Sequence, residues 1–365
     1  MRILFLAPLR ANTGNSTTAD RIKSHLEAAG HDCELLDAAG VQSPLDVAKL
    51  ISQRMFDAGL AIHMYKAGRF LLANRIPFGV IFGGTDINED VKNAEKCRVM
   101  GAVLGEARFA VAFTYKMKEA AAKHWPQAIS KIRIQPQGIR TTPNVAFDFE
   151  AFLHNTVFHL YSNHSAVKMT WQDSFSGMMR SPENTQMFLL ICGLRRVKDP
   201  LYLVEAFSEW HEREPRVCLA IIGPMVDPLF TNEVKAKLHN IDGVHLIEEI
   251  PQADLQALIK RSFAVVNSSL SEGMSAAILE AMDLEVPVLA RDIPGNAAIV
   301  RHGDTGLLFS NPKEFVKLAK RLMSEPNLKR KITNNAKNYI CTHHSWELER
   351  ETYQNLVQSC LSEEL

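Results

Sequence analysis

The sequence predicts an α/β fold of two Rossmann-like, doubly wound domains, each built on a parallel sheet. Short apolar runs alternate with helix-like patterns along nearly the whole chain, which is typical of β-α-β units. Polar residues and glycines that suit ligand binding follow these runs, as expected at the carboxyl ends of parallel strands. The length of 365 residues is sufficient for two domains, and 46% hydrophobic with 22% charged residues is typical of a globular protein.

Four segments are predicted along the chain. Residues 1–146 form the first domain, residues 147–184 a linker or insertion, residues 185–345 the second domain, and residues 346–365 a C-terminal helix. The insertion is longer than a short interdomain connection requires. Its aromatic side chains argue against simple disorder, and we assign it no function.

Six apolar runs predict the strands of the first domain, at residues 2–7, 32–36, 60–63, 78–82, 109–112 and 131–134. Two strand ends carry candidate polar groups. His63 ends the third strand, and Thr85 and Asp86 follow the fourth. A histidine at a strand end is often structural, and Asp86 equally fits a cap of the helix that begins near Asn88.

The segment after the first strand, residues 10–17, contains Gly14 and Asn15. It lacks the G-x-G-x-x-G pattern, so a nicotinamide dinucleotide site is not predicted. Its small polar side chains suit hydrogen bonding to a ligand's hydroxyl groups, and they suit a surface turn equally well.

Six further runs predict the strands of the second domain, at residues 188–192, 217–222, 244–246, 263–266, 286–290 and 306–309. The first of these ends at Gly193 and leads into a basic turn with Arg195, Arg196 and Lys198, before a helix over residues 201–211. A cationic loop between a strand and a helix is typical of an anion site, with a solvated basic turn as the alternative.

Glu272 and Glu280 lie either side of a predicted turn-to-helix junction, with the helix over residues 275–284. Gly273 allows the backbone to approach a ligand, and the first N–H groups of the helix attract a diphosphate. Glu280 lies in an otherwise apolar helix, where a carboxylate is costly unless it is paired or accepts hydroxyl hydrogen bonds. The alternative is an ordinary strand-turn-helix unit with two solvated glutamates.

The pattern Glu272-Gly273, Glu280-Ala281-Met282 and Pro287-Val288, followed by residues 292–296 and 302–308, resembles the GT-B-fold retaining glycosyltransferases of the "group 1" (E-x7-E) family. The resemblance implies two domains facing across a cleft and a C-terminal helix that crosses back. It also implies transfer of a hexose from a nucleotide diphosphate sugar, a UDP- or GDP-sugar, to a hydroxyl acceptor, without a cofactor or metal.

The resemblance further implies roles for individual residues. The catalytic residues are Glu272, His63, Lys198 and either Arg195 or Arg196. The donor contacts are Gly193, Gly223, Gly273, Met274, Ser275, Glu280, Glu249 and Ile250, and the acceptor contacts are Gly14, Asn15, Thr85 and Asp86. Two positions depart from the family pattern, which has arginine directly after the glycine of the basic turn and often an aromatic residue in place of Met274.

Two other functions remain compatible with these motifs. A degenerate sugar-nucleotide-binding or scaffold protein would keep the donor pocket without transfer, as the displaced arginine and Met274 would allow. A phosphorylase of similar fold would carry a lysine-bound pyridoxal phosphate, and no motif indicates one.

Composition and charge argue against several other classes of protein. A formal net charge of zero and a pI near 7.2 give no electrostatic case for nucleic acid. The six cysteines lack metal-ligand spacing, so reduced thiols are predicted. No run of 18 apolar residues predicts a transmembrane helix. Residues 1–9 resemble a short signal peptide, which would make the protein secreted, but we interpret them as the first strand and expect a cytoplasmic protein.

Overall fold

The computed structural model describes residues 1–10, 14–72, 74–153, 185–239 and 241–361. These residues form two compact units. The first unit comprises Met1–Ile139, Glu272–Ser275 and Cys341–Leu365, and the second comprises Arg140–Ser271 and Ala276–Ile340. Most of the predicted insertion at 147–184 lies outside the described residues.

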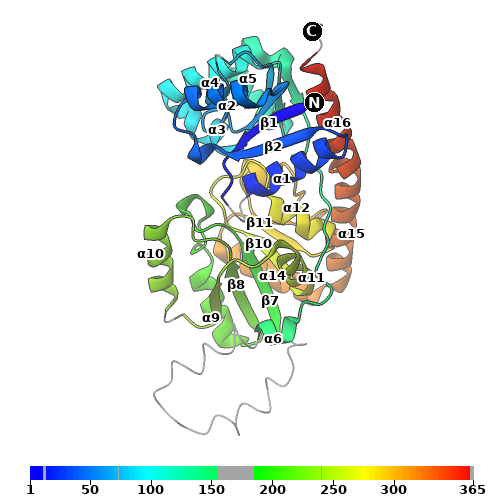
Figure 1. Ribbon diagram of the computed structural model, residues 1–365. Helices are drawn as coiled ribbons and strands as arrows, with labels where there is room; N and C mark the ends of the chain where they lie inside the picture. Colours follow the sequence, from blue (N-terminus) through cyan, green and yellow to red (C-terminus); the bar gives the residue numbers. More distant parts are fainter. Residues whose placement is uncertain (11–13, 73, 154–184, 240, 362–365) are drawn as a thin grey trace. The chain divides into compact units, whose positions relative to one another are not determined.

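The first unit contains a six-stranded parallel sheet in the order β2-β1-β3-β4-β5-β6. Figure 1 labels β1 and β2 of this sheet. Its strands are β1 (Arg2–Ala7), β2 (Asp32–Asp37), β3 (Ala58–Ile62), β4 (Phe78–Ile81), β5 (Phe109–Ala112) and β6 (Ile132–Ile134). Its helices are α1 (Gly14–Glu27), α2 (Pro44–Arg54), α3 (Gly84–Asn88), α4 (Ala94–Glu106), α5 (Tyr115–His124) and α16 (Trp346–Ser359), with short 3₁₀ helices η1 (Ala38–Gly40), η2 (Gly68–Leu71), η3 (Asp90–Lys92) and η4 (Pro126–Lys131).

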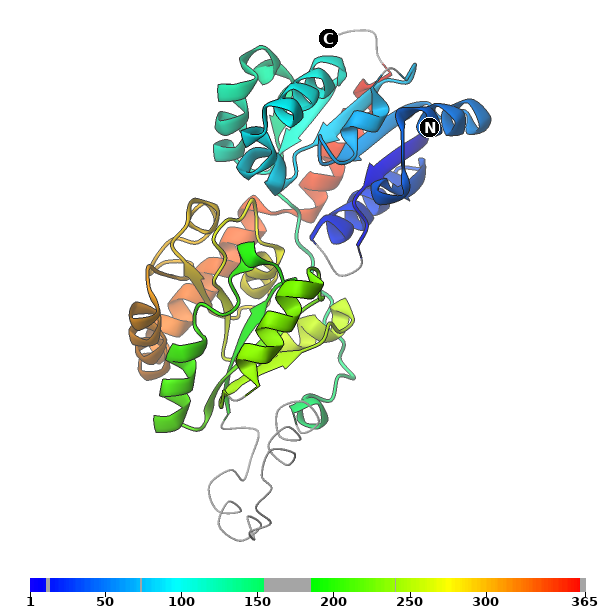
Figure 2. The same ribbon diagram turned by 90° about the vertical axis from the view of Figure 1, so that its left-hand side faces the viewer.

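The second unit contains another six-stranded parallel sheet, in the order β12-β11-β10-β7-β8-β9. Its strands are β7 (Gln186–Ile191), β8 (Val217–Ile222), β9 (Val244–Ile247), β10 (Ala264–Asn267), β11 (Val288–Arg291) and β12 (Leu307–Phe309). Its helices are α6 (Phe149–Leu153), α9 (Val204–Arg213), α10 (Pro228–Leu238), α11 (Gln252–Arg261), α12 (Ala276–Asp283), α13 (Pro294–Ala297), α14 (Pro312–Ser324) and α15 (Pro326–His343), with η7 (Arg196–Lys198). Figures 1 and 2 show helices packed against both faces of this sheet.

The twelve predicted strands are confirmed, with ends that differ by at most two residues. Buried parallel strands are continuous apolar runs, and every residue of β3 and β8 is buried. Several helix starts differ from the prediction, and the helix expected to begin near Asn88 is α3, which begins at Gly84. The helix predicted from residue 201 begins at Val204, and Gly14 opens α1, where the sequence had indicated a loop or turn.

The C-terminal helix α16 packs on α1 within the first unit. Ser345 caps it, because the Ser345 hydroxyl accepts a hydrogen bond from the N–H of Leu348 at 3.2 Å. Charged groups are buried where the two helices meet: Arg21 of α1 pairs with Glu349 of α16 at 2.8 Å, and Glu349 is 0% exposed. Helix α16 is therefore an integral part of the first unit.

Candidate functional site

In the second unit, the predicted donor residues follow strands of one parallel sheet. Gly193 lies just after β7, Gly223 follows β8, Glu249 and Ile250 follow β9, and residues 267–271 end and follow β10. These four strands are consecutive in the sheet order and run in the same direction. Their carboxyl ends therefore lie along one edge of the sheet, which is where α/β proteins bind ligands.

Two glycines at this edge are required by the protein's own packing. Gly223 has φ +147°, and a Cβ atom there would lie 2.2 Å from the carbonyl oxygen of Cys192. A Cβ atom on Gly193 would lie 2.7 Å from Cγ2 of Val226. The loops after β7 and β8 thus pack closely against one another, and this contact fixes the start of the basic loop.

The two arginines of the basic loop have different surroundings. Arg196 is exposed, pairs with Glu233 at 2.6 Å and lies over the Phe230 ring, with its guanidinium carbon 5.1 Å from the ring centroid. Arg195 precedes η7 in extended backbone, and its Nε is buried without a hydrogen-bond partner among the described residues. Arg196 is therefore already engaged by α10, whereas Arg195 has a buried donor available.

The basic loop and the segment after β10 are joined by hydrogen bonds. The Ser268 hydroxyl donates to the carbonyl oxygens of Lys198 at 3.1 Å and Asp199 at 2.9 Å. The N–H of Leu270 donates to the carbonyl oxygen of Val197 at 2.8 Å. The structure therefore brings the Lys198 loop to the segment that leads into Glu272, although the two motifs are far apart in the sequence.

Glu280 lies on α12 and is 8% exposed. The side-chain amide of Gln252, the first residue of α11, donates a hydrogen bond to its Oε1 at 2.7 Å. The buried carboxylate thus has a neutral donor, which lowers the cost of its burial. Gln252 lies just after Glu249 and Ile250 in the sequence. Its hydrogen bond therefore connects the loop after β9 to Glu280, two predicted parts of the donor site.

Glu272, Gly273 and Met274 are partly buried and Ser275 is buried. They precede α12, which begins at Ala276, one residue later than predicted. These four residues group with the first unit of the structure.

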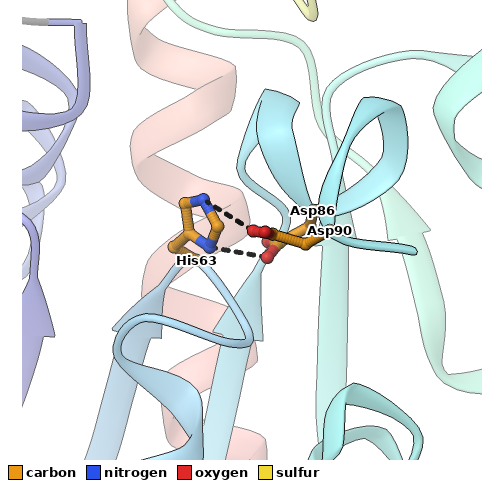
Figure 3. Close-up of side chains that lie close together, drawn as sticks. All are labelled: His63, Asp86 and Asp90. Atoms are coloured by element: carbon orange, nitrogen blue, oxygen red, sulfur yellow. Dashed lines mark ion pairs between the residues drawn. The ribbon is translucent and has the colours of Figure 1, made fainter. Parts of the chain in front are cut away.

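In the first unit, His63 lies at the centre of a buried polar network (Figure 3). Its Nδ1 is 2.6 Å from Oδ1 of Asp86, and its Nε2 contacts the Thr85 hydroxyl. Asp86 is 0% exposed, and its Oδ2 also accepts hydrogen bonds from the N–H groups of Gly83 at 2.8 Å and Met64 at 2.9 Å. Asp86 therefore caps α3 and orients the imidazole at the same time.

Two further residues complete this network. Oδ2 of Asp90 is 3.9 Å from Nε2 of His63, and Oδ1 of Asp90 is 2.6 Å from the Lys96 ammonium. His63, Asp86 and Asp90 have ligand atoms close enough to hold a metal ion. The Lys96 ammonium already supplies positive charge, however, and both ring nitrogens of His63 face protein oxygens. We therefore interpret the cluster as an ion-pair network.

The remaining acceptor-side residues are at the surface. Gly14 is exposed and Asn15 partly buried in the first turn of α1, while Thr85 is partly buried in α3. Thr85 is thus the member of the His63 network that combines a contact to the ring with partial exposure.

Several residues near these groups were not identified from the sequence: Asp199, Gln252, Arg291, Asp90 and Lys96. Three of them have a signal in the sequence. Asp199 directly follows Lys198, Gln252 is a polar residue at the start of a helix, and Arg291 is a charged residue at the end of an apolar strand.

Three of the buried thiols are poor nucleophiles. Burial raises the pKa values of Cys33, Cys218 and Cys360 to about 12. A thiol needs its thiolate form to react, so these three are inert near neutral pH.

Comparison with known sequences identifies the domain. Residues 174–339 match the model of the family described as glycosyl transferases group 1. The chain is 68% identical over 357 residues to glycosyltransferase 1 domain-containing protein 1 of Xenopus tropicalis, covering 98% of this chain and 97% of that protein. The sequence motifs by themselves predict a similarity to the animal glycosyltransferase 1 domain-containing protein. The Xenopus tropicalis relative confirms this prediction. Spore coat protein SA of Bacillus subtilis is 25% identical over 173 residues, covering 44% of this chain and 46% of that protein.

Comparison with solved structures confirms the GT-B fold. The Anabaena HepE structure in complex with UDP-glucose has a TM-score of 0.72 at 15% identity and covers 98% of this chain and 100% of its own. Sucrose-phosphate synthase from Thermosynechococcus elongatus has a TM-score of 0.74 at 14% identity, with coverage of 98% and 99%. Within the described residues, no helix has the length and apolar character needed to cross a membrane.

Proposed function

Because the chain belongs to the group 1 glycosyltransferases, we propose that it transfers a hexose from a nucleotide diphosphate sugar to a hydroxyl acceptor, with retention of configuration and without a metal ion. The observation that carries this proposal is the junction of the two donor motifs. Ser268 and Leu270 hydrogen-bond to the backbone of the basic loop and lead directly to Glu272. Such a junction would hold the cationic groups beside the segment of the second unit that precedes the glutamate motif.

Arg195 and Lys198 bind the donor diphosphate in this proposal. The buried Nε of Arg195, which has no hydrogen-bond partner among the described residues, supports its role over that of Arg196. A guanidinium donates two hydrogen bonds to a phosphate, and an ammonium adds a compact charge. Together they would stabilise the negative charge that develops on the leaving diphosphate, which is the electrostatic contribution expected to lower the barrier most.

Glu280 binds the ribose hydroxyl groups in this proposal. A carboxylate accepts several hydrogen bonds, and Gln252 already donates one to Oε1. Ribose hydroxyls would donate further hydrogen bonds to the same carboxylate, with the base read by the backbone near Glu249 and Ile250. Gly193, Gly223, Gly273, Met274 and Ser275 complete the proposed donor contacts.

Glu272 orients the transferred sugar, and the His63 network acts on the acceptor side. The His63 side chain is 1% exposed, so we propose that it acts on the acceptor indirectly, through the Thr85 hydroxyl that its Nε2 contacts. Asp86 holds the ring through Nδ1, and Gly14 and Asn15 form the rest of the proposed acceptor contacts.

The proposed reaction is a front-face displacement. The bond between the anomeric carbon and the phosphate oxygen breaks while the acceptor oxygen bonds to the same face of that carbon. The acceptor's proton passes to the leaving phosphate oxygen. This route needs no covalent nucleophile, so the glutamates act by binding and electrostatics.

UDP-hexoses are the first donors to test, because the structural neighbour HepE is a UDP-glucose complex. We propose a cytoplasmic enzyme that requires no cofactor. Residues 3–7 of β1 are 0% exposed, and residues 3–6 pair with both β2 and β3. Residues 2–7 therefore form a central strand of the sheet of the first unit.

The test is thermal stabilisation of the purified chain by UDP-, GDP- and ADP-hexoses, with and without a chelator. A ligand that binds the folded state raises the midpoint by mass action. We expect one donor class to raise it in chelator, and Lys198→Ala and Glu280→Ala to abolish the shift. Lys235→Ala and Glu205→Gln change exposed side chains of α10 and α9 and are the matched controls.

Release of the nucleoside diphosphate then separates enzyme from scaffold. An enzyme transfers or slowly hydrolyses the donor, and Glu272→Ala lowers that rate. Donor binding with no turnover in the presence of a panel of acceptors, and no hydrolysis, would favour the degenerate sugar-nucleotide-binding protein. Absence of binding to every donor would contradict the proposed function.

A further inference from the structure

Arg291, the last residue of β11, contacts both loops of the proposed donor site. Its Nη1 lies 2.9 Å from Oδ2 of Asp199 and 3.3 Å from the carbonyl oxygen of Ser268. Its guanidinium carbon lies 3.8 Å from the centroid of the Tyr202 ring, which places the cation over the aromatic face. The side chain is 20% exposed, so these contacts are partly shielded from water.

Asp199 is held in a conformation that needs support. Its φ is +44°, in the left-handed region that non-glycine residues adopt at a cost, although aspartate tolerates it better than most. It directly follows Lys198 and ends η7. Any group that fixes Asp199 therefore also fixes the backbone from which the Lys198 side chain extends.

The backbone of Arg291 is connected through Asn296 to the end of β10. Asn296 is 0% exposed, and its side-chain amide donates to the carbonyl oxygen of Arg291 at 3.0 Å and to Oδ1 of Asn267 at 3.1 Å. Asn267 in turn accepts from the N–H of Ser269. Three neighbouring strand ends, those of β7, β10 and β11, are thus connected through polar side chains.

We propose that Arg291 is a positioning residue of the donor site: it holds the Lys198 loop against the segment after β10, and so sets the cations that bind the donor diphosphate. This inference rests on the proposed function for its ligand. Arg291 acts through Asp199 and Ser268 and is not itself assigned a contact with the donor.

Hydrogen exchange of the ligand-free chain tests, without any donor, whether Arg291 holds the Lys198 loop against the segment after β10. We call this contact the clamp. The amides of Lys198, Asp199 and Leu270 donate within this junction. We expect Arg291→Ala to speed their exchange by about tenfold, because local opening becomes easier. Arg301→Ala is the matched control: Arg301 pairs with Asp304 at 3.1 Å and lies 5.6 Å from the Tyr339 ring centroid elsewhere in the same unit. Unchanged exchange in Arg291→Ala would overturn the clamp.

Binding of UDP-glucose and of uridine tests its consequence. We expect Arg291→Ala to weaken UDP-glucose by about tenfold and to leave uridine unchanged, since only the diphosphate contacts depend on the Lys198 loop. Arg291→Lys keeps a cation beside Asp199 and should recover much of the loss. A general defect of the fold would weaken both ligands, and that result would contradict the positioning role.

A double-mutant cycle separates positioning from direct contact. Asp199→Asn removes the charge while keeping a residue that tolerates a positive φ. If Arg291 acts through Asp199, the double variant binds UDP-glucose no more weakly than Arg291→Ala alone. Additive losses would instead identify Arg291 as a direct phosphate ligand and overturn the proposal. A different outcome is that the wild type binds no nucleotide sugar while Arg291→Ala still speeds amide exchange. That outcome would contradict the proposed function and the role of Arg291 in a donor site, but it would support the clamp itself.

Discussion

At the scale of single residues, chemistry follows from surroundings more than from residue type. Arg195 and Arg196 are adjacent and carry the same charge, yet α10 engages Arg196 through Glu233 and Phe230. Arg195 keeps a buried Nε with no hydrogen-bond partner in the described part of the chain. Adjacent residues can therefore serve different purposes, one in holding η7 to α10 and the other in the proposed anion site.

The arginine pair gives a direct prediction. Arg195→Ala should weaken binding of the stabilising nucleotide sugar by about 10- to 100-fold, because a hydrogen bond to a charged group contributes about 1.5–3 kcal/mol. Arg196→Ala should change the affinity by less than about threefold, since its ion pair is exposed and such pairs are weak. Isothermal titration of both variants measures this difference, and a larger loss in Arg196→Ala would reverse the assignment.

A second residue-scale prediction concerns backbone packing at the donor edge. Gly223→Ala should lower the free energy of unfolding by about 3 kcal/mol, because φ is +147° and the new Cβ would lie 2.2 Å from the Cys192 carbonyl oxygen. Gly14→Ala is the control, since a Cβ there meets no atom within 4 Å and the residue is helical. Urea denaturation compares them. Equal stability of the two variants would show that the loops after β7 and β8 can separate at little cost.

At the scale of secondary-structure elements, the attachment of α16 to α1 depends on a buried charged cluster. Glu349 is paired with Arg21 at 2.8 Å and with His25 at 3.0 Å, and the three side chains are almost fully buried. Burial alone would raise the pKa of Glu349, but the charges and hydrogen bonds of Arg21 and His25 outweigh it and lower the pKa below its ordinary value. The carboxylate therefore stabilises the fold above its unfolded pKa, and this contribution is lost as the pH falls through the lowered value.

Removing one member of this cluster should be costly. Glu349→Gln should destabilise the chain by about 3 kcal/mol, because it leaves the Arg21 guanidinium buried without its counter-charge. Glu351→Gln changes an exposed glutamate on the same helix and should have an effect below about 0.5 kcal/mol. Chemical denaturation near neutral pH checks both values. Similar midpoints would mean that α16 is held by its apolar contacts alone.

At the scale of the whole molecule, the sheets were predictable and the contacts between their ends were not. Buried parallel strands are uninterrupted apolar runs, so all twelve could be located from the sequence. Glu280 could be identified as a costly buried carboxylate, but its partner Gln252 lies on another helix. Arg291 can contact Asp199 because β11 and β7 are both direct neighbours of β10 in the sheet. Strand order arises from tertiary packing, and no local pattern encodes it.

The pH dependence of stability is also a property of the whole molecule, because both units contain a buried neutral histidine. In the second unit, burial and then the nearby His211 charge lower the pKa of His245 from its ordinary value of 6.5 to about 4. In the first unit, burial lowers the pKa of His344, partly opposed by its hydrogen bond to the carbonyl oxygen of Gln137. At a pH below the ordinary histidine pKa, the unfolded chain binds protons that the folded chain does not. The free energy of unfolding therefore decreases as the pH is lowered.

For His245 the window runs from pH 6.5 down to about 4, and the expected loss across it is about 3 kcal/mol. Urea denaturation across this range should therefore show a midpoint that falls with pH, and His245→Phe should flatten the decline whatever its own stability. His124→Gln changes an exposed histidine and should keep the full decline. If His245→Phe keeps it too, the acid sensitivity resides elsewhere, and the lowered pKa of His344 makes the first unit the next place to look.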